Sequence, residues 1–86
     1  MIWLKVLDQL KGKVTGPSFE EWFSDTTGFY DPEKSLFIVE SSTTLHHEWI
    51  SHRYEKLIRT SITEITGEEK LNLVFRVRKD SSVHLH

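Results

Sequence analysis

The sequence predicts an α+β domain whose elements follow the order α-α-β-β-α-β. Apolar residues recur at helical spacing in two stretches, at residues 2–14 and 45–66. Over residues 71–78, the apolar residues Leu71, Leu73, Phe75 and Val77 alternate with a second set that is polar except for Val74, which is typical of a strand with one buried face. Between the two helical stretches, the turn sequence DPEK separates two short strand-like runs. Together these patterns predict a three-stranded sheet packed with helices.

The first helix is expected over residues 2–14. Its apolar side chains share one face: Ile2, Trp3, Val6, Leu7, Leu10 and Val14. Leu4 points away from that face, so we expect it to be exposed. Gly16 and Pro17 are predicted to end this helix, because proline lacks the backbone N–H that a helix interior needs.

The second helix is expected to begin at Ser18. Ser18 and Glu21 have the spacing of a capping box, in which each side chain satisfies a free amide of the other residue. The apolar residues of this segment are Phe19, Trp22 and Phe23. A helix of about two turns is unstable alone in water, so packing of these aromatic side chains must hold it.

A β-hairpin is predicted next, with strands from Thr27 to Tyr30 and from Ser35 to Glu40. Pro32 presets the backbone angle of the turn. The run LFIV at residues 36–39 is apolar at every position. We therefore expect the second strand to be central and covered on both faces.

The long helix is predicted to start at a cap among residues 41–44 and to run to Thr66, with Gly67 as its left-handed C-terminal residue. Its expected buried stripe is Leu45, Trp49, Tyr54, Leu57, Ile58, Ser61, Ile62 and Ile65. The last strand follows at residues 71–78. The domain is expected to span residues 1–79, with a flexible tail at residues 80–86.

Composition excludes several classes of function. A chain of 86 residues makes one domain, and its formal net charge of -2 is unlike that of a dedicated nucleic-acid binder. There is no cysteine, and the three histidines at 46, 47 and 52 lack the i, i+4 spacing of a helical metal site. No catalytic motif is present. We therefore expect a cytoplasmic protein that is not an enzyme, binds no metal or cofactor and does not enter a membrane.

A weak contact with single-stranded DNA is an alternative function. The cationic residues that would contact phosphate are Lys56, Arg59, Arg76 and Arg78. Glu55 and Glu64 on the same helix dilute this charge. The aromatic and glycine-rich motifs of sequence-specific RNA-binding modules are missing.

The ordered motifs PSFEEW, WISHRYEKLI and ITGEE, preceded by an amphipathic helix with Trp3, resemble the N-terminal domain of the bacterial replication initiator DnaA. The resemblance spans about residues 2–78. It implies a compact, KH-like α+β fold and a role in interaction rather than catalysis. The partners it implies are further initiator molecules, the replicative helicase, regulators of initiation and, weakly, single-stranded DNA.

By position, the resemblance assigns self-association to Trp3. It assigns contact with the helicase or a regulator to Ser18, Glu21, Trp22, Thr43 and Leu45. Family members commonly carry P-N-x-F where this chain has STTL at residues 42–45, so Leu45 replaces an aromatic anchor. Partner specificity depends on such local chemistry. A stand-alone regulator of the initiator is a further alternative.

Overall fold

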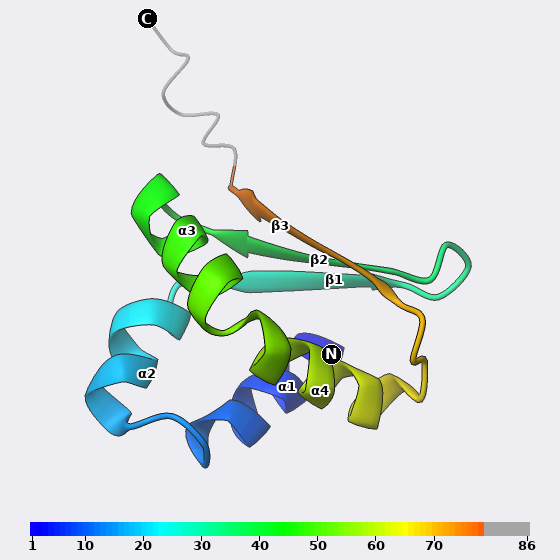
Figure 1. Cartoon of the computed structure of the whole chain (residues 1–86), viewed down its shortest axis with the longest axis horizontal. Helices are drawn as coiled ribbons and strands as arrows, with labels where there is room; N and C mark the ends of the chain where they lie inside the picture. The colour runs from blue at the N-terminus through cyan, green and yellow to red at the C-terminus, as the bar shows by residue number, and fades with distance from the viewer. Residues whose placement is uncertain (79–86) are drawn as a thin grey trace, which may run out of the picture.

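The computed structural model describes residues 1–78, which form four helices and one three-stranded sheet (Figure 1). In chain order the elements are α1 (Ile2–Lys11), α2 (Gly16–Phe23), β1 (Thr27–Asp31), β2 (Leu36–Ser41), α3 (Thr44–Arg53), α4 (Glu55–Thr66) and β3 (Asn72–Val77). The strand order is β1-β2-β3, with β1 antiparallel and β3 parallel to β2. The predicted α+β class and the central position of β2 are confirmed.

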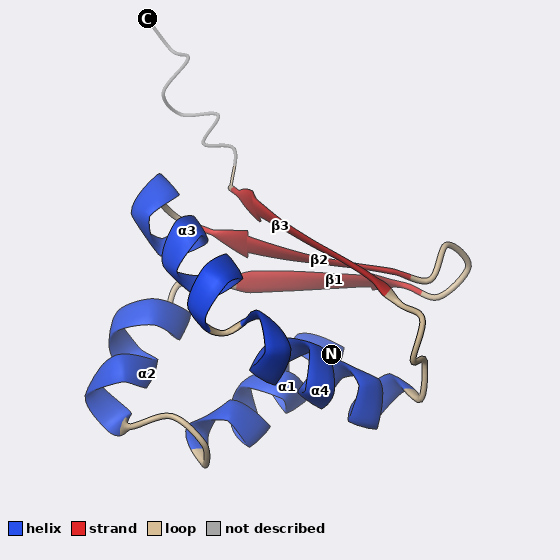
Figure 2. Ribbon diagram, viewed as in Figure 1, coloured by secondary structure: helices blue, strands red, loops and turns tan. Residues whose placement is uncertain are grey.

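All four helices lie on one side of the sheet (Figure 2). Helix α1 packs against α4 and β1, α3 packs against β2 and β3, and α2 bridges α1 and α3. The core lies between these layers. Its fully buried members are Val6, Leu10, Phe23, Phe37, Val39, Ile50, Ile58 and Ile62. None of the helices within residues 1–78 has the length and apolar character that crossing a membrane requires.

The expectation that β2 is covered on both faces is wrong. Phe37 and Val39 face the helices and are fully buried, but Ile38 faces the other way, between Phe29 of β1 and Val74 of β3. Phe29 is 55% exposed, so this face of the sheet is open. Ile38 is half-buried because the two edge strands flank it, which explains the apolar run without a second layer of helices.

The long helix expected up to Thr66 is two helices, separated at Tyr54. Tyr54 has φ −113° and ψ 8°, outside the helical range. Its ring packs edge-on against Phe23, with centroids 5.1 Å apart. The break lets α3 lie along the sheet while α4 lies along α1. No glycine or proline marks the break in the sequence.

The start of α2 also differs from the prediction. The helix begins at Gly16 after the N-cap residue Thr15, whose side chain makes no capping hydrogen bond. Ser18 therefore lies inside the first turn, and the predicted capping box is not formed. Pro17 is tolerated there because the first N–H groups of a helix have no partner within it. Helix α1 ends at Lys11, three residues earlier than expected.

The loop after α4 is tied to the hairpin by Glu68. Its carboxylate accepts hydrogen bonds from the Tyr30 hydroxyl at 2.7 Å and from the Ser35 hydroxyl at 3.1 Å. The bond to Glu68 raises the pKa of Tyr30 above its ordinary value of 10.0, and desolvation and the carboxylate charge act in the same direction. Gly67 has φ +78°, which confirms the predicted left-handed end of the helix.

Candidate docking surface

Helix α2 and the first turns of α3 lie side by side and are joined by stacked tryptophans. The rings of Trp22 and Trp49 are nearly parallel, at 11°, with centroids 4.7 Å apart. Trp49 is 39% exposed, and Leu45, one turn before it, is 64% exposed. The side chain of Glu21 is 61% exposed. Two predicted docking residues therefore reach solvent at the junction of the two helices.

A histidine holds this junction together. His46 Nε2 lies 3.0 Å from the carbonyl oxygen of Glu21, and its Nδ1 lies 2.7 Å from the Thr43 hydroxyl. Because a carbonyl can only accept, Nε2 donates to it, and in the neutral imidazole Nδ1 is then the acceptor for the Thr43 hydroxyl. Thr43 Oγ1 in turn accepts from the His46 amide at 3.1 Å, which caps α3. Thr43 thus orients the ring that connects α3 to α2.

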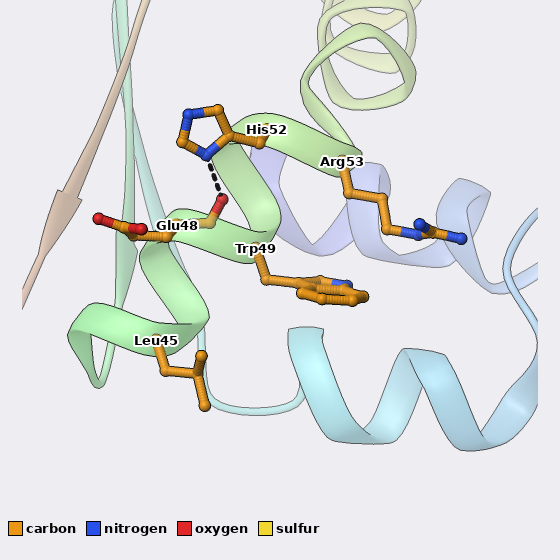
Figure 3. Close-up of a pocket in the computed structure, with 5 residues that line it drawn as sticks. All are labelled: Leu45, Glu48, Trp49, His52 and Arg53. Atoms are coloured by element: carbon orange, nitrogen blue, oxygen red, sulfur yellow. Dashed lines mark hydrogen bonds between the residues drawn. The ribbon is translucent and has the colours of Figure 1, made fainter.

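One face of α3 forms a shallow groove beside this junction (Figure 3). It is lined by Leu45, Glu48, Trp49, His52 and Arg53. These positions are spaced by three and four residues, so they share one side of the helix. The Arg53 guanidinium carbon lies 5.4 Å from the centroid of the Trp49 ring, which is a cation–π contact. We call Glu21, Trp22, Leu45, Trp49 and Arg53 the α2–α3 surface.

Four of the five residues predicted for docking gather at this junction: Glu21, Trp22, Thr43 and Leu45. The fifth, Ser18, lies one turn before Trp22 on α2 and is half-exposed. The prediction that Leu45 and Trp49 belong to a buried stripe is wrong, because both side chains are exposed. In α3 only Ile50 is buried, because this helix contacts the sheet along a narrow line.

Trp49 and Arg53 were missed as members of the site. The signal that was available is their spacing from Leu45. Residues 45, 49 and 53 form an i, i+4, i+8 row of large side chains, whereas Ile50 lies off that row. The apolar pair Leu45 and Trp49, which lies on a different side from Ile50, indicates a second, outward-facing contact.

Trp3, predicted to mediate self-association, lies in the core. It is 2% exposed, and its Nε1–H donates to Thr26 Oγ1 at 3.2 Å. The indole lies so close to Gly28 that a Cβ added to this glycine would be 2.8 Å from the ring. In this structure a partner cannot reach the indole. The neighbouring Leu4 is 62% exposed, as expected.

The cationic residues considered for single-stranded DNA do not form one patch. Arg59 bonds the Glu55 carboxylate at 2.8 Å, Arg76 bonds Glu40 at 2.7 Å, and Arg78 lies 3.5 Å from Asp25. Arg59 and Lys56 are on α4, whereas Arg76 is on the open face of the sheet. The structure separates these groups and neutralises the three arginines.

Comparison with known proteins identifies the family. The family model described as the DnaA N-terminal domain matches residues 1–64. The chain belongs to the DnaA N-terminal domain family. The resemblance in its motifs is thereby confirmed.

A solved structure shows the same fold. The chain is similar to one in the crystal structure of a HobA–DnaA (domain I-II) complex from Helicobacter pylori. The TM-score is 0.76 at 16% sequence identity, over 92% of this chain and 100% of that chain. The α+β architecture of this DnaA N-terminal domain is therefore one that an experimental structure also contains.

Proposed function

We propose that this DnaA N-terminal domain is a protein-interaction domain in the initiation of bacterial chromosome replication. The α2–α3 surface docks regulators of initiation and the replicative helicase. The observation that carries the proposal is the Trp22–Trp49 stack, in which Trp22 is half-buried and Trp49 is 39% exposed, with the exposed Leu45 beside it. Aromatic and apolar anchors surrounded by polar side chains are typical of the energetic centre of a small protein interface.

The fold neighbour supports docking of a regulator, because that protein was crystallised in a complex with HobA. The site itself supports binding rather than chemistry. Its groove is shallow and open, and it is lined along one helix face. We propose that the domain works without catalysis or cofactor, in the cytoplasm.

Self-association is the second part of the proposed role. Met1 is 81% exposed and Leu4 is 62% exposed, and both line a depression on α1 that also includes Lys5, Asp8, Gln9 and Ile65. We propose that this exposed side of α1 contacts a second initiator molecule. Trp3 contributes indirectly, because it seats α1 on β1.

An NMR titration tests the docking site. Isotope-labelled domain is titrated with the replicative helicase of the same organism, and we expect the largest shifts at Glu21, Leu45 and the indole N–H groups of Trp22 and Trp49. Leu45→Ala should weaken binding by about tenfold or more, as expected for an interface anchor.

Leu4→Ala is a matched control. Both leucines are helical and nearly equally exposed, at 62% and 64%. Leu4→Ala should leave helicase affinity within about twofold, as is usual for a surface change away from the contact. Shifts confined to the open face of the sheet, around Phe29, would refute the assignment of the site.

A further inference from the structure

Arg53 differs from the other arginines of this chain in having no carboxylate partner within the described residues. The sequence has four arginines, and all of them lie within residues 1–78. Arg59, Arg76 and Arg78 each pair with an acidic side chain. Arg53 is exposed, and its guanidinium lies over the Trp49 ring.

A cation–π contact with Trp49 favours the observed position of the Arg53 guanidinium. Trp49 stacks on Trp22 at 4.7 Å, and Arg53 lies 5.4 Å from the Trp49 centroid. Figure 3 shows Trp49 between the Arg53 side chain and α2. A guanidinium that lies over an aromatic ring keeps N–H groups available for a ligand. Because the stack already orients this side chain, less conformational entropy is lost when it binds.

The surrounding charges decide what kind of ligand suits Arg53. Glu48 lines the same groove, and Figure 3 shows its side chain extending away from the Arg53 guanidinium. Glu20 and Glu21 are exposed on α2. These three carboxylates oppose a polyanion such as nucleic acid, because one arginine among them cannot offset repulsion along a phosphate chain. A single carboxylate directed at Arg53 avoids that repulsion.

We propose that Arg53 receives an aspartate or glutamate of the protein partner, while an apolar side chain of the same partner segment covers Leu45 and Trp49. This inference rests on the proposed function of the α2–α3 surface. An arginine binds a carboxylate through two parallel hydrogen bonds, which gives directional as well as electrostatic recognition. The partner segment should therefore carry its aspartate or glutamate where it meets Arg53, and it should have no acidic residue opposite Glu21.

The geometry of α3 sets the spacing in the partner. Leu45 and Arg53 are eight residues apart, which is about 12 Å along the helix. A partner helix lying along α3 needs its apolar anchor and its carboxylate about seven or eight residues apart. An extended segment spans the same distance in about four residues.

Charge reversal at Arg53 tests the inference, with the replicative helicase of the same organism as the probe. Arg53→Glu should weaken binding by about tenfold or more, because it removes a charge-assisted bond and places two acids together. Arg53→Lys should also lose most of the affinity for the helicase, because a lysine ammonium cannot form the bidentate pair of hydrogen bonds with a carboxylate. The matched control is Lys56→Glu, an equal change of charge at an exposed site on α4.

The decisive measurement is rescue. Replacing the acidic residue that the bound helicase segment places at Arg53 with arginine should restore binding to Arg53→Glu but not to Leu45→Ala. If Leu45→Ala abolishes binding while Arg53→Glu changes it by less than about twofold, the inference is overturned and the docking site stands. If Arg53→Glu and Lys56→Glu weaken binding equally, the loss of affinity comes from the changed net charge of the domain, and the inference is also overturned. If neither Leu45→Ala nor Arg53→Glu affects binding, the proposed function is refuted as well.

Discussion

Replacing Trp3 with alanine tests whether this residue acts through the fold or through direct contact with a partner. The indole is 2% exposed and packs against Phe37, with ring centroids 5.9 Å apart. Truncating a buried tryptophan costs about 3–5 kcal/mol. Gly28 forms the floor beneath the ring and has no side chain that could fill the cavity, which places the cost near the top of that range.

The lost bond from Nε1 to Thr26 adds to this cost, at about 1 kcal/mol. A small domain has a total stability of about 5 kcal/mol, so Trp3→Ala should be largely unfolded. Urea unfolding followed by far-ultraviolet circular dichroism gives the loss, and sedimentation velocity gives self-association on the same samples. Leu4→Ala, a change at an exposed neighbour, should alter stability by less than about 0.5 kcal/mol while it weakens self-association.

A Trp3→Ala protein that keeps the wild-type urea midpoint and no longer self-associates would show that the indole leaves the core to contact a partner. A Leu4→Ala protein that still self-associates fully would remove the exposed side of α1 from the interface.

Three further predictions concern the sheet, the hairpin and the cap of α3. Gly28→Ala should lower the free energy of unfolding by about 1–3 kcal/mol, because the added Cβ would overlap the Trp3 indole. Gly16→Ala is the control, because Gly16 has open space around it and its substitution should not lower the free energy of unfolding. Equal urea midpoints for the two variants would contradict this packing. The phenol of Tyr30 should ionise above pH 10.0 in an ultraviolet absorbance titration, and Glu68→Gln should lower that pKa. Because the raised pKa favours the protonated phenol in the folded state, this contribution to stability is complete below pH 10.0 and is lost as pH rises through the folded pKa. Thr43→Ala should lower the free energy of unfolding, measured in urea, by about 1 kcal/mol, because it removes the hydroxyl that caps α3. Thr43→Ser keeps this hydroxyl and should lower the free energy much less. An equal loss in both variants would show that the methyl group of Thr43 matters rather than its hydroxyl.

The elements could be predicted from the sequence because their periodicities are strong. The apolar face of α1, the alternation in β3 and the hairpin around Pro32 all correspond to observed elements. The break at Tyr54 could not be predicted, since it comes from the packing of two layers and has no local signal. The open face of the sheet was missed for a related reason. The sequence of an apolar strand shows the same pattern whether its second face is covered by helices or is shielded only by the side chains of neighbouring strands.

The docking site could be predicted only in part. The motifs led to Glu21, Trp22 and Leu45, and the structure brings these residues together. The α2–α3 surface also depends on Trp49, whose large apolar side chain is normally a sign of burial. Trp49 instead lies outside the core, where its ring stacks on Trp22, and this is a contact between residues distant in the sequence. Arg53 becomes notable only when the ion pairs of the other arginines are known.

The three tryptophans give this domain intrinsic fluorescence signals from two places, the docking surface and the core. Trp22 and Trp49 report on the surface where we expect partners, and Trp3 reports on the interior. An intrinsic fluorescence change on adding a partner can therefore be assigned by comparing Trp49→Phe with the unaltered chain. Docking and unfolding can be followed in one unlabelled sample.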